Sequence, residues 1–152
     1  MKNIITAILL FFAGSIFSQQ DLFKKIKEQL KKEHPEMNVE NKLIVVNVWS
    51  VNDSKSREKN MQLTKAYTFY EHAKLKGGLK GMIAVVFCTD NDVATEDIIL
   101  TKDKTLKPIV LKDKKDLSFP EISNIIFDSN GNVIKKNMTT DIFEEVHQLI
   151  TR

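Results

Sequence analysis

The segment VVNVWSVNDSKSREKN, residues 45–60, joins two patterns of different character. Its first part, Val45 to Trp49, is apolar and rich in β-branched residues, which predicts a buried β-strand. Its second part is polar and leads into a long helical pattern, and Asp53 and Ser54 are residue types favoured at helix N-caps. The segment therefore predicts a strand, a polar turn and a helix in direct succession.

Apolar spacing predicts the remaining elements on either side of this segment. In chain order we expect a helix over residues 21–34, a strand over 43–49, a helix over 54–76, a strand over 82–88, a weaker helix over 91–103, a short extended piece over 108–111, two strands over 123–128 and 132–136, and a helix over 139–151 capped by Thr140 or Asp141. Early strands joined through helices are expected to be parallel, and the late hairpin to add antiparallel neighbours. The sequence therefore predicts an α/β fold with a mixed central sheet and helices on both faces.

The first eighteen residues differ from the rest of the chain. Lys2 precedes an apolar run over residues 4–12 and a small-residue stretch over 14–18, which is the pattern of a secretory signal peptide cut near Ser18. The apolar run is short for a bilayer span, so an uncleaved anchor is the less favoured alternative. We therefore expect residues 19–152 to form one domain that is exported to the periplasm or the cell exterior, without stable membrane insertion after cleavage.

Charge and motifs exclude several classes of function. Loss of Lys2 with the signal peptide leaves 22 of the 23 basic residues against 20 acidic ones, and the two signs are interleaved, so nucleic acid is not an expected partner. The histidines His34, His72 and His147 lack metal-ligand spacing, and no phosphate loop or dinucleotide fingerprint is present. We therefore expect neither a metal nor a cofactor.

The chain contains one cysteine, Cys88. A lone cysteine cannot form an internal disulfide, and this one follows the apolar run over residues 82–87, where a small buried thiol is the expected role. The alternative is a reactive or intermolecular thiol, which would need exposure and a lowered pKa.

Three stretches, in this order of elements, resemble the thioredoxin-like superfamily and, within it, exported thiol–disulfide oxidoreductases. Residues 45–50, which include Asn47 and Trp49, are similar to the strand before that family's active site. Arg57 and Glu58 follow the loop at the place where the family often has a basic residue and then Glu. Residues 124–134 are similar to the family's late strand, its turn with an acidic residue and glycine, and its return strand. The resemblance covers about residues 40–152. It implies a thioredoxin-like three-layer sandwich, preceded here by an extra N-terminal helix.

The chain departs from the family at the reactive corner. Aligned on Trp49, the family's Cys-x-x-Cys motif falls on four other residues, Asp53, Ser54, Lys55 and Ser56. Dithiol exchange needs a thiolate at a helix N-terminus and a second thiol to resolve the mixed disulfide, and neither a carboxylate nor a hydroxyl does either. The resemblance therefore implies a degenerate, redox-inactive loop in which aspartate and serine cap the helix.

The family also has a cis-proline directly before its late strand. The equivalent position here is Ile122, or Pro120 if the loop is shifted. Because a cis bond before a non-proline residue costs about 2.5–4 kcal/mol, we predict a trans bond before Ile122.

Three hypotheses of function follow. The favoured one is a non-catalytic binding or accessory protein of the cell envelope, with a groove around Trp49, Asp53, Ser56 and Ile122 for a peptide or protein partner. The alternative is a thiol–disulfide oxidoreductase-type redox protein that works through Cys88. A weaker third hypothesis is a purely structural domain.

Overall fold

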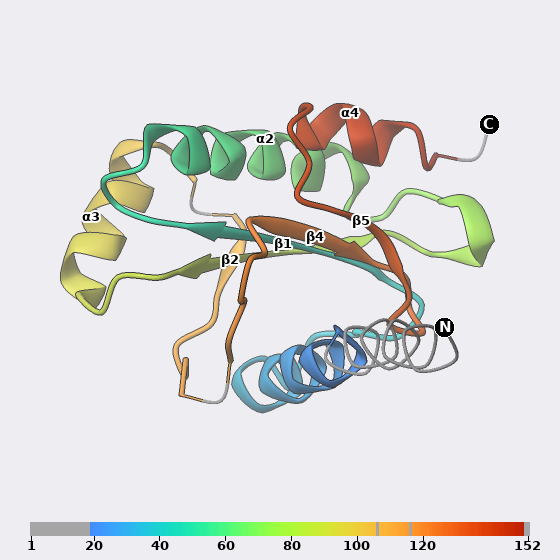
Figure 1. The fold of residues 1–152 in the computed structure, drawn as a ribbon. Coiled ribbons are helices and arrows are strands. Elements are labelled where there is room, and N and C mark those ends of the chain that lie inside the picture. Colours follow the sequence, from blue (N-terminus) through green and yellow to red (C-terminus); the bar gives the residue numbers. More distant parts are fainter. Residues whose placement is uncertain (1–18, 106, 116, 151–152) are drawn as a thin grey trace, which may run out of the picture.

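The computed structural model describes residues 19–105, 107–115 and 117–150 (Figure 1). Its centre is a five-stranded sheet with the order β3-β2-β1-β4-β5. The strands are β1 (Leu43–Trp49), β2 (Met82–Cys88), β3 (Ile109–Val110), β4 (Asn124–Phe127) and β5 (Val133–Lys136). Strand β1 pairs in parallel with β2, and β2 with β3, whereas β4 is antiparallel to both β1 and β5. The predicted mixed sheet with an antiparallel late hairpin is confirmed.

Helices cover both faces of the sheet, as predicted (Figure 1). Helices α2 (Ser54–Tyr70) and α4 (Ile142–His147) lie side by side on one face, and the N-terminal helix, residues 19–33, lies on the other. Helix α3 (Val93–Lys102) lies beyond the carboxyl end of β2 and packs into the same core as α2. The result is a three-layer sandwich with an extra helix before the first strand.

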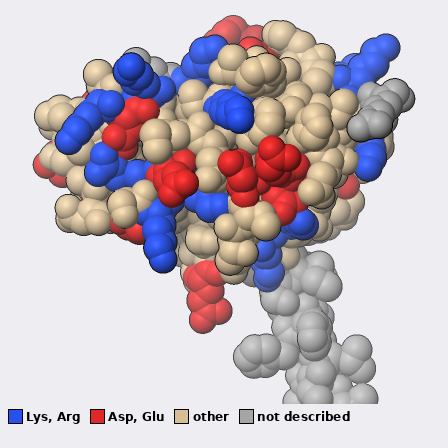
Figure 2. Space-filling view, turned by 90° about the horizontal axis from the view of Figure 1, so that it is seen from above, with Lys and Arg blue, Asp and Glu red and all other residues tan. Residues whose placement is uncertain are grey.

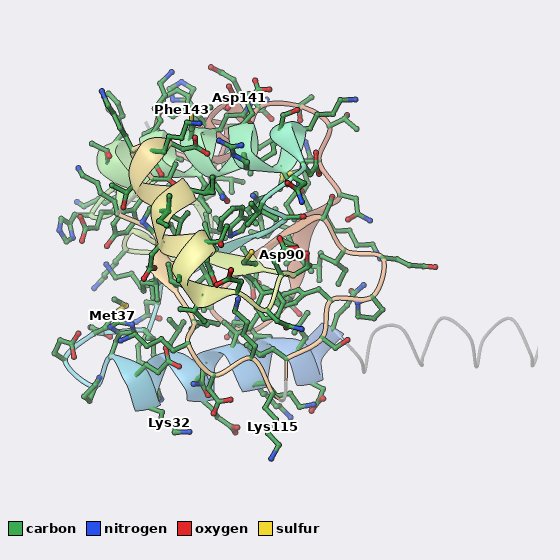
Figure 3. The ribbon with its side chains drawn as sticks, turned by 90° about the vertical axis from the view of Figure 1, so that its left-hand side faces the viewer. Lys32, Met37, Asp90, Lys115, Asp141 and Phe143 are labelled. Carbon is green, nitrogen blue, oxygen red and sulfur yellow. The ribbon has the colours of Figure 1, made fainter. Side chains whose placement is uncertain are left out.

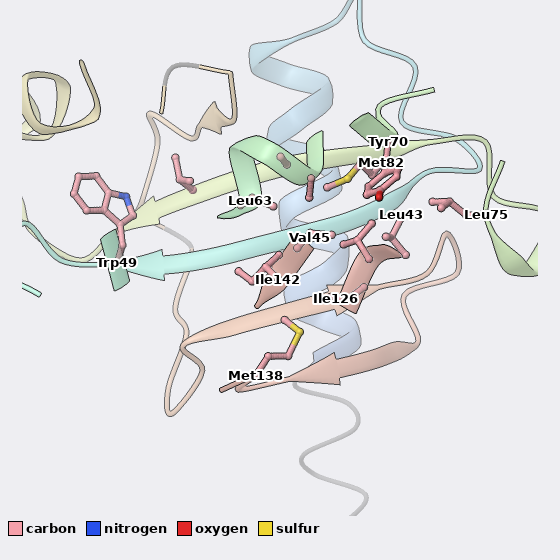
Figure 4. Packing of buried hydrophobic residues seen from close by; sticks show 14 of the residues in the cluster. Leu43, Val45, Trp49, Leu63, Tyr70, Leu75, Met82, Ile126, Met138 and Ile142 are labelled. Carbon is pink, nitrogen blue, oxygen red and sulfur yellow. The ribbon is translucent and has the colours of Figure 1, made fainter. Parts of the chain in front are cut away.

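The sheet is buried on both faces, which explains why β1 and β2 are nearly continuous apolar runs. Leu43 and Val45 of β1 point into the core beneath α2 and α4, together with Ile126 of β4 (Figure 4). The second core lies beneath the N-terminal helix, where the side chains of Ile26 and Leu30 are completely buried. The extra helix is therefore part of the folded domain and not a loose extension.

Two predicted helices are shorter in the structure, for one shared reason. Helix α2 ends at Tyr70 instead of residue 76, and α4 ends at His147 instead of residue 151. The segment after α2 turns and pairs with the segment after α4: Leu75 forms a bridge with Ile150, and the Lys76 amide donates to Leu149 O at 2.7 Å. Burial of Leu75 in this pairing outweighs the local helical pattern.

Two predictions concern the membrane. The predicted signal peptide, residues 1–18, lies outside the described residues, so its cleavage near Ser18 stays a prediction. Within the described part of the chain, no helix is both long and apolar enough to cross a bilayer.

Candidate functional site

The N-terminus of α2 is capped by Asp53 and stabilised by Ser56, the residues that align with the family's cysteines. Asp53 is the N-cap, with extended backbone angles, and its Oδ1 accepts a hydrogen bond from the Lys55 amide at 3.0 Å. The Ser56 hydroxyl donates to Asp53 O at 3.0 Å and accepts from the Ser50 amide at 3.2 Å. The predicted capping role of Asp53 is confirmed, and the Ser56 hydroxyl is already engaged on both sides, so nothing prepares it as a nucleophile.

The side chain of Asn47 connects strand β1 to helix α2 through hydrogen bonds. Its side chain is 1% exposed, and its Nδ2 donates to Ser56 O at 2.9 Å and to Asn60 Oδ1 at 2.7 Å. Across the sheet it pairs with Asn124 of β4, whose side chain is bonded in both directions to the Met138 backbone. Buried amides thus hold the first turns of α2 and the ends of β4 and β5 in fixed relation.

A cleft of about 470 Å³ opens between these elements. Asp53, Ser56 and Lys59 line its helix side, and Ser123, Asn124 and Thr139 line the opposite side. Lys59 spans the opening, because its Nζ donates to the carbonyls of Thr139 and Thr140. The volume lies within the range of sites that hold small ligands or peptide side chains.

Two of the predicted groove residues lie elsewhere. Trp49 is 1% exposed and packs in the core beneath α2, so it offers no surface to a partner, and this part of the prediction is wrong. Ile122 packs against the other core and lines a separate depression with Pro120. Ser123, the next residue, lines the cleft in place of Ile122.

The peptide bonds before Ile122 and Pro120 are both trans. The trans bond predicted before Ile122 is therefore confirmed.

Sequence reasoning missed the far wall of the cleft. Ser123, Met138 and Thr139 lie far from residue 53 in the sequence and belong to the segments around β4 and β5. The only available signal was the likeness of residues 124–134 to a late hairpin, which places a loop near the head of α2 but does not say which side chains face it.

Cys88 ends β2 beside Trp49 in the parallel register. Its side chain is 1% exposed, and burial raises the pKa of the thiol to about 11. Its Sγ lies 3.6 Å from Asp90 Oδ2. The structure therefore supports the buried role of the thiol and gives it neither the exposure nor the lowered pKa that reactivity requires.

Charged residues close over this end of β2. Lys114 Nζ donates to Glu96 Oε2 at 2.8 Å and to Cys88 O at 3.1 Å, and the Glu96 side chain is 1% exposed. Asp90 Oδ2 accepts from the Val51 amide at 2.7 Å, and this bond lowers the pKa of Asp90 below its usual range. Asp90 is half-buried and lies beside α3 (Figure 3).

An ion pair connects α2 to α3. Arg57 meets Asp103 with both Nε and Nη2, at 2.7 and 2.6 Å, in a partly buried, two-pronged contact. The hydrogen bonds from Arg57 lower the pKa of Asp103. This pair fixes the first turn of α2 against the end of α3.

Other charged and imidazole groups do not assemble into a site. The face over α2 and α4 shows Lys or Arg interspersed with Asp and Glu (Figure 2). Among the described residues, no group of His, Cys, Asp or Glu is arranged to hold a metal ion. His147 Nδ1 lies 2.7 Å from the Tyr70 hydroxyl, while His34 and His72 lie elsewhere.

Comparison with known proteins yields structural matches. Neither a model of a known protein family nor any curated protein matches the sequence. The thioredoxin domain of a thiol-disulfide oxidoreductase from Bacteroides vulgatus matches with a TM-score of 0.57 and 20% identity, over 74% of this chain and 82% of that one. A thiol:disulfide interchange protein from a Bacteroides species matches with a TM-score of 0.55 and 21% identity, over 72% of this chain and 73% of that one.

A third match is a thioredoxin-like protein from Parabacteroides distasonis, with a TM-score of 0.52 and 16% identity, over 74% of this chain and 81% of that one. At these identities the likeness concerns the fold. The protein therefore has a thioredoxin-like fold, with Asp53 at the head of α2 and its single cysteine buried at the end of β2.

Proposed function

We propose that this protein binds an extended polypeptide segment in the cleft beside the head of α2 and does not exchange disulfides there. One observation carries the proposal. The two positions that align with the reactive cysteines hold Asp53 and Ser56, whose polar groups are engaged in closing the turn, while a cleft of about 470 Å³ beside them remains open. A redox role through Cys88 is disfavoured by the burial and raised pKa of its thiol.

The proposed place of action is the periplasm or the cell exterior. Support comes from the N-terminal pattern of Lys2, an apolar run and small residues before position 19. A lone buried thiol suits an oxidising compartment, because it forms no wrong disulfide while the domain stays folded.

The redox half of the proposal is tested by the reduction of insulin with dithiothreitol. We expect the purified protein to add no turnover to that of dithiothreitol alone, since it lacks a second thiol to resolve a mixed disulfide. Turnover comparable to that of a dithiol enzyme would end the proposal.

The binding half is tested with reduced, carboxymethylated α-lactalbumin, an unfolded chain without free thiols. We expect the immobilised protein to retain it, and Ser123→Trp to abolish retention by filling the cleft. Thr101→Trp, on the exposed end of α3, is the matched control and should bind normally. Equal retention by both variants would place binding elsewhere, and no retention by the unchanged protein would favour a purely structural domain.

A further inference from the structure

The orientation of the Asn47 side chain is fixed by its neighbours. Its amide nitrogen lies 2.9 Å from Ser56 O and 2.7 Å from Asn60 Oδ1. Ser56 O is an acceptor, and a flipped Asn47 amide would place its own oxygen against that carbonyl and lose the bond. Both hydrogens of Nδ2 are therefore used, and Oδ1 must point away from these partners.

That oxygen has no partner. Among the buried side-chain nitrogen and oxygen atoms of the described residues, those without a hydrogen bond are Asn47 Oδ1, Trp49 Nε1 and Glu96 Oε1. Of these three residues, Asn47 is the one that lines the cleft. A buried acceptor without a donor is unfavourable, and because Asn47 lines the cleft, a ligand that displaces the groups over Oδ1 can supply the missing donor.

The charges around the cleft define what kind of donor fits. Lys55 and Lys59 line it together with Asp53 and Glu58, so the local formal charge is balanced. The 17-residue helix α2 also begins there, and its N-terminus disfavours a cation. An uncharged N–H group suits this setting better than an ammonium or guanidinium group.

We infer that Asn47 Oδ1 is a specificity-determining acceptor that takes one backbone N–H of a bound polypeptide. The inference rests on the proposed function and deepens it, because it names the chemical group of the ligand that the cleft recognises. A peptide N–H is uncharged and is present in every polypeptide, so the contact selects an extended chain and not a particular side chain.

The ligand for the test is the shortest segment of carboxymethylated α-lactalbumin that the protein retains, synthesised with blocked ends. A series of analogues replaces one amide at a time by an ester, which removes the N–H donor with little change in size. Affinities are measured by titrating the ¹⁵N-labelled protein and following the backbone and side-chain amide signals of Asn47 and the backbone amide signal of Ser56. We expect one ester in the series to bind about 10-fold more weakly than the parent, as for a lost buried hydrogen bond.

The protein-side variant is Asn47→Ala, compared by the same titration. In this variant the parent segment and the critical ester should bind equally, because the acceptor is gone. If Asn47→Ala does not fold, the unchanged protein still tests the inference, because the critical ester should shift the Asn47 side-chain amide signals less than the parent segment does.

The possible failures can be told apart. If the parent segment binds in the cleft and every ester binds as tightly, Asn47 Oδ1 meets only water, and the inference is overturned while the proposed function stands. If Asn47→Ala keeps the same discrimination against the critical ester, the donor is received by another group and the inference is likewise wrong. If no segment of α-lactalbumin is retained, the proposed function itself fails.

Discussion

Two corners of this molecule lie at the same edge of the sheet and differ in what they can do. The head of α2, with Asp53 and Ser56, has a helix N-terminus and exposure to solvent, but no sulfur. The end of β2, with Cys88, has the sulfur but is buried beneath the Lys114–Glu96 pair. Trp49 and Cys88 are partners in the parallel register, so the two corners follow adjacent strand ends.

The difference shows that the reactivity of a thiol depends on its surroundings as much as on the presence of a cysteine. A helix N-terminus stabilises an anion, whereas a dry core disfavours it. This chain separates the two requirements, because the favourable location holds a capping carboxylate and the thiol lies where burial raises its pKa to about 11.

The largest expected effect comes from placing thiols at the favourable corner with Asp53→Cys and Ser56→Cys together. A thiol at a helix N-terminus in such a motif has a pKa near 7, so at pH 7 its thiolate fraction should exceed that of Cys88 roughly 5,000-fold. We expect reaction with iodoacetamide to be faster by about 100-fold, because the lower nucleophilicity of a low-pKa thiolate offsets part of this gain, and we expect insulin reduction to appear.

The single variant Ser56→Cys is the control, since one thiol cannot resolve a mixed disulfide. A folded double variant whose thiols react no faster than Cys88 would show that the head of α2 does not stabilise a thiolate.

Removing Lys114 tests whether the charged cover of the other corner depends on its ion pair with Glu96. Lys114→Met leaves the buried carboxylate of Glu96 without its partner, which should lower the free energy of unfolding by about 3 kcal/mol. The measurement is urea denaturation followed by circular dichroism. Lys115→Met is the matched control, because Lys115 is exposed and points outward (Figure 3). Equal stability of the two variants would mean that Glu96 does not depend on Lys114.

The thiolate fraction of Cys88 in the unchanged protein should be roughly 200-fold below that of an ordinary thiol at pH 8, which slows its reaction, because its pKa is raised to about 11. Burial lowers the rate further, and unfolding in urea should restore it. In the native protein the rate should keep rising as the pH approaches 11, where an ordinary thiol has already levelled off. Rapid native-state reaction with a thiol reagent at pH 8 would revive the redox hypothesis.

The smallest effect concerns the cap. Asp53→Ala should lower the free energy of unfolding by about 1 kcal/mol, because the Lys55 amide loses its acceptor. Asp53→Asn keeps an acceptor and should lower the free energy of unfolding by only about 0.3 kcal/mol. Thermal and urea unfolding of the two variants give the comparison. No difference between them would contradict a capping role for this side chain.

Much of the fold could be predicted from local patterns. Strands β1 and β2 match the predicted bounds, since apolar β-branched runs bounded by polar residues leave little ambiguity. The ends of α2 and α4 could not be predicted, because the pairing of Leu75 with Ile150 joins parts of the chain 75 residues apart. The cap at Asp53 was predictable from residue type, whereas the position of Ser123 at the cleft was not.

The sequence by itself determined that this chain has one thiol and that a carboxylate and a hydroxyl occupy the places of the reactive cysteines, because these are matters of residue identity. It also determined the order of strands and helices, since local spacing and burial leave a periodic pattern. Only the tertiary structure decided that Cys88 is sealed and that Asn47 has an unmet acceptor beside a cleft. Exposure and hydrogen-bond pairing depend on residues distant in the chain, which a local pattern does not contain.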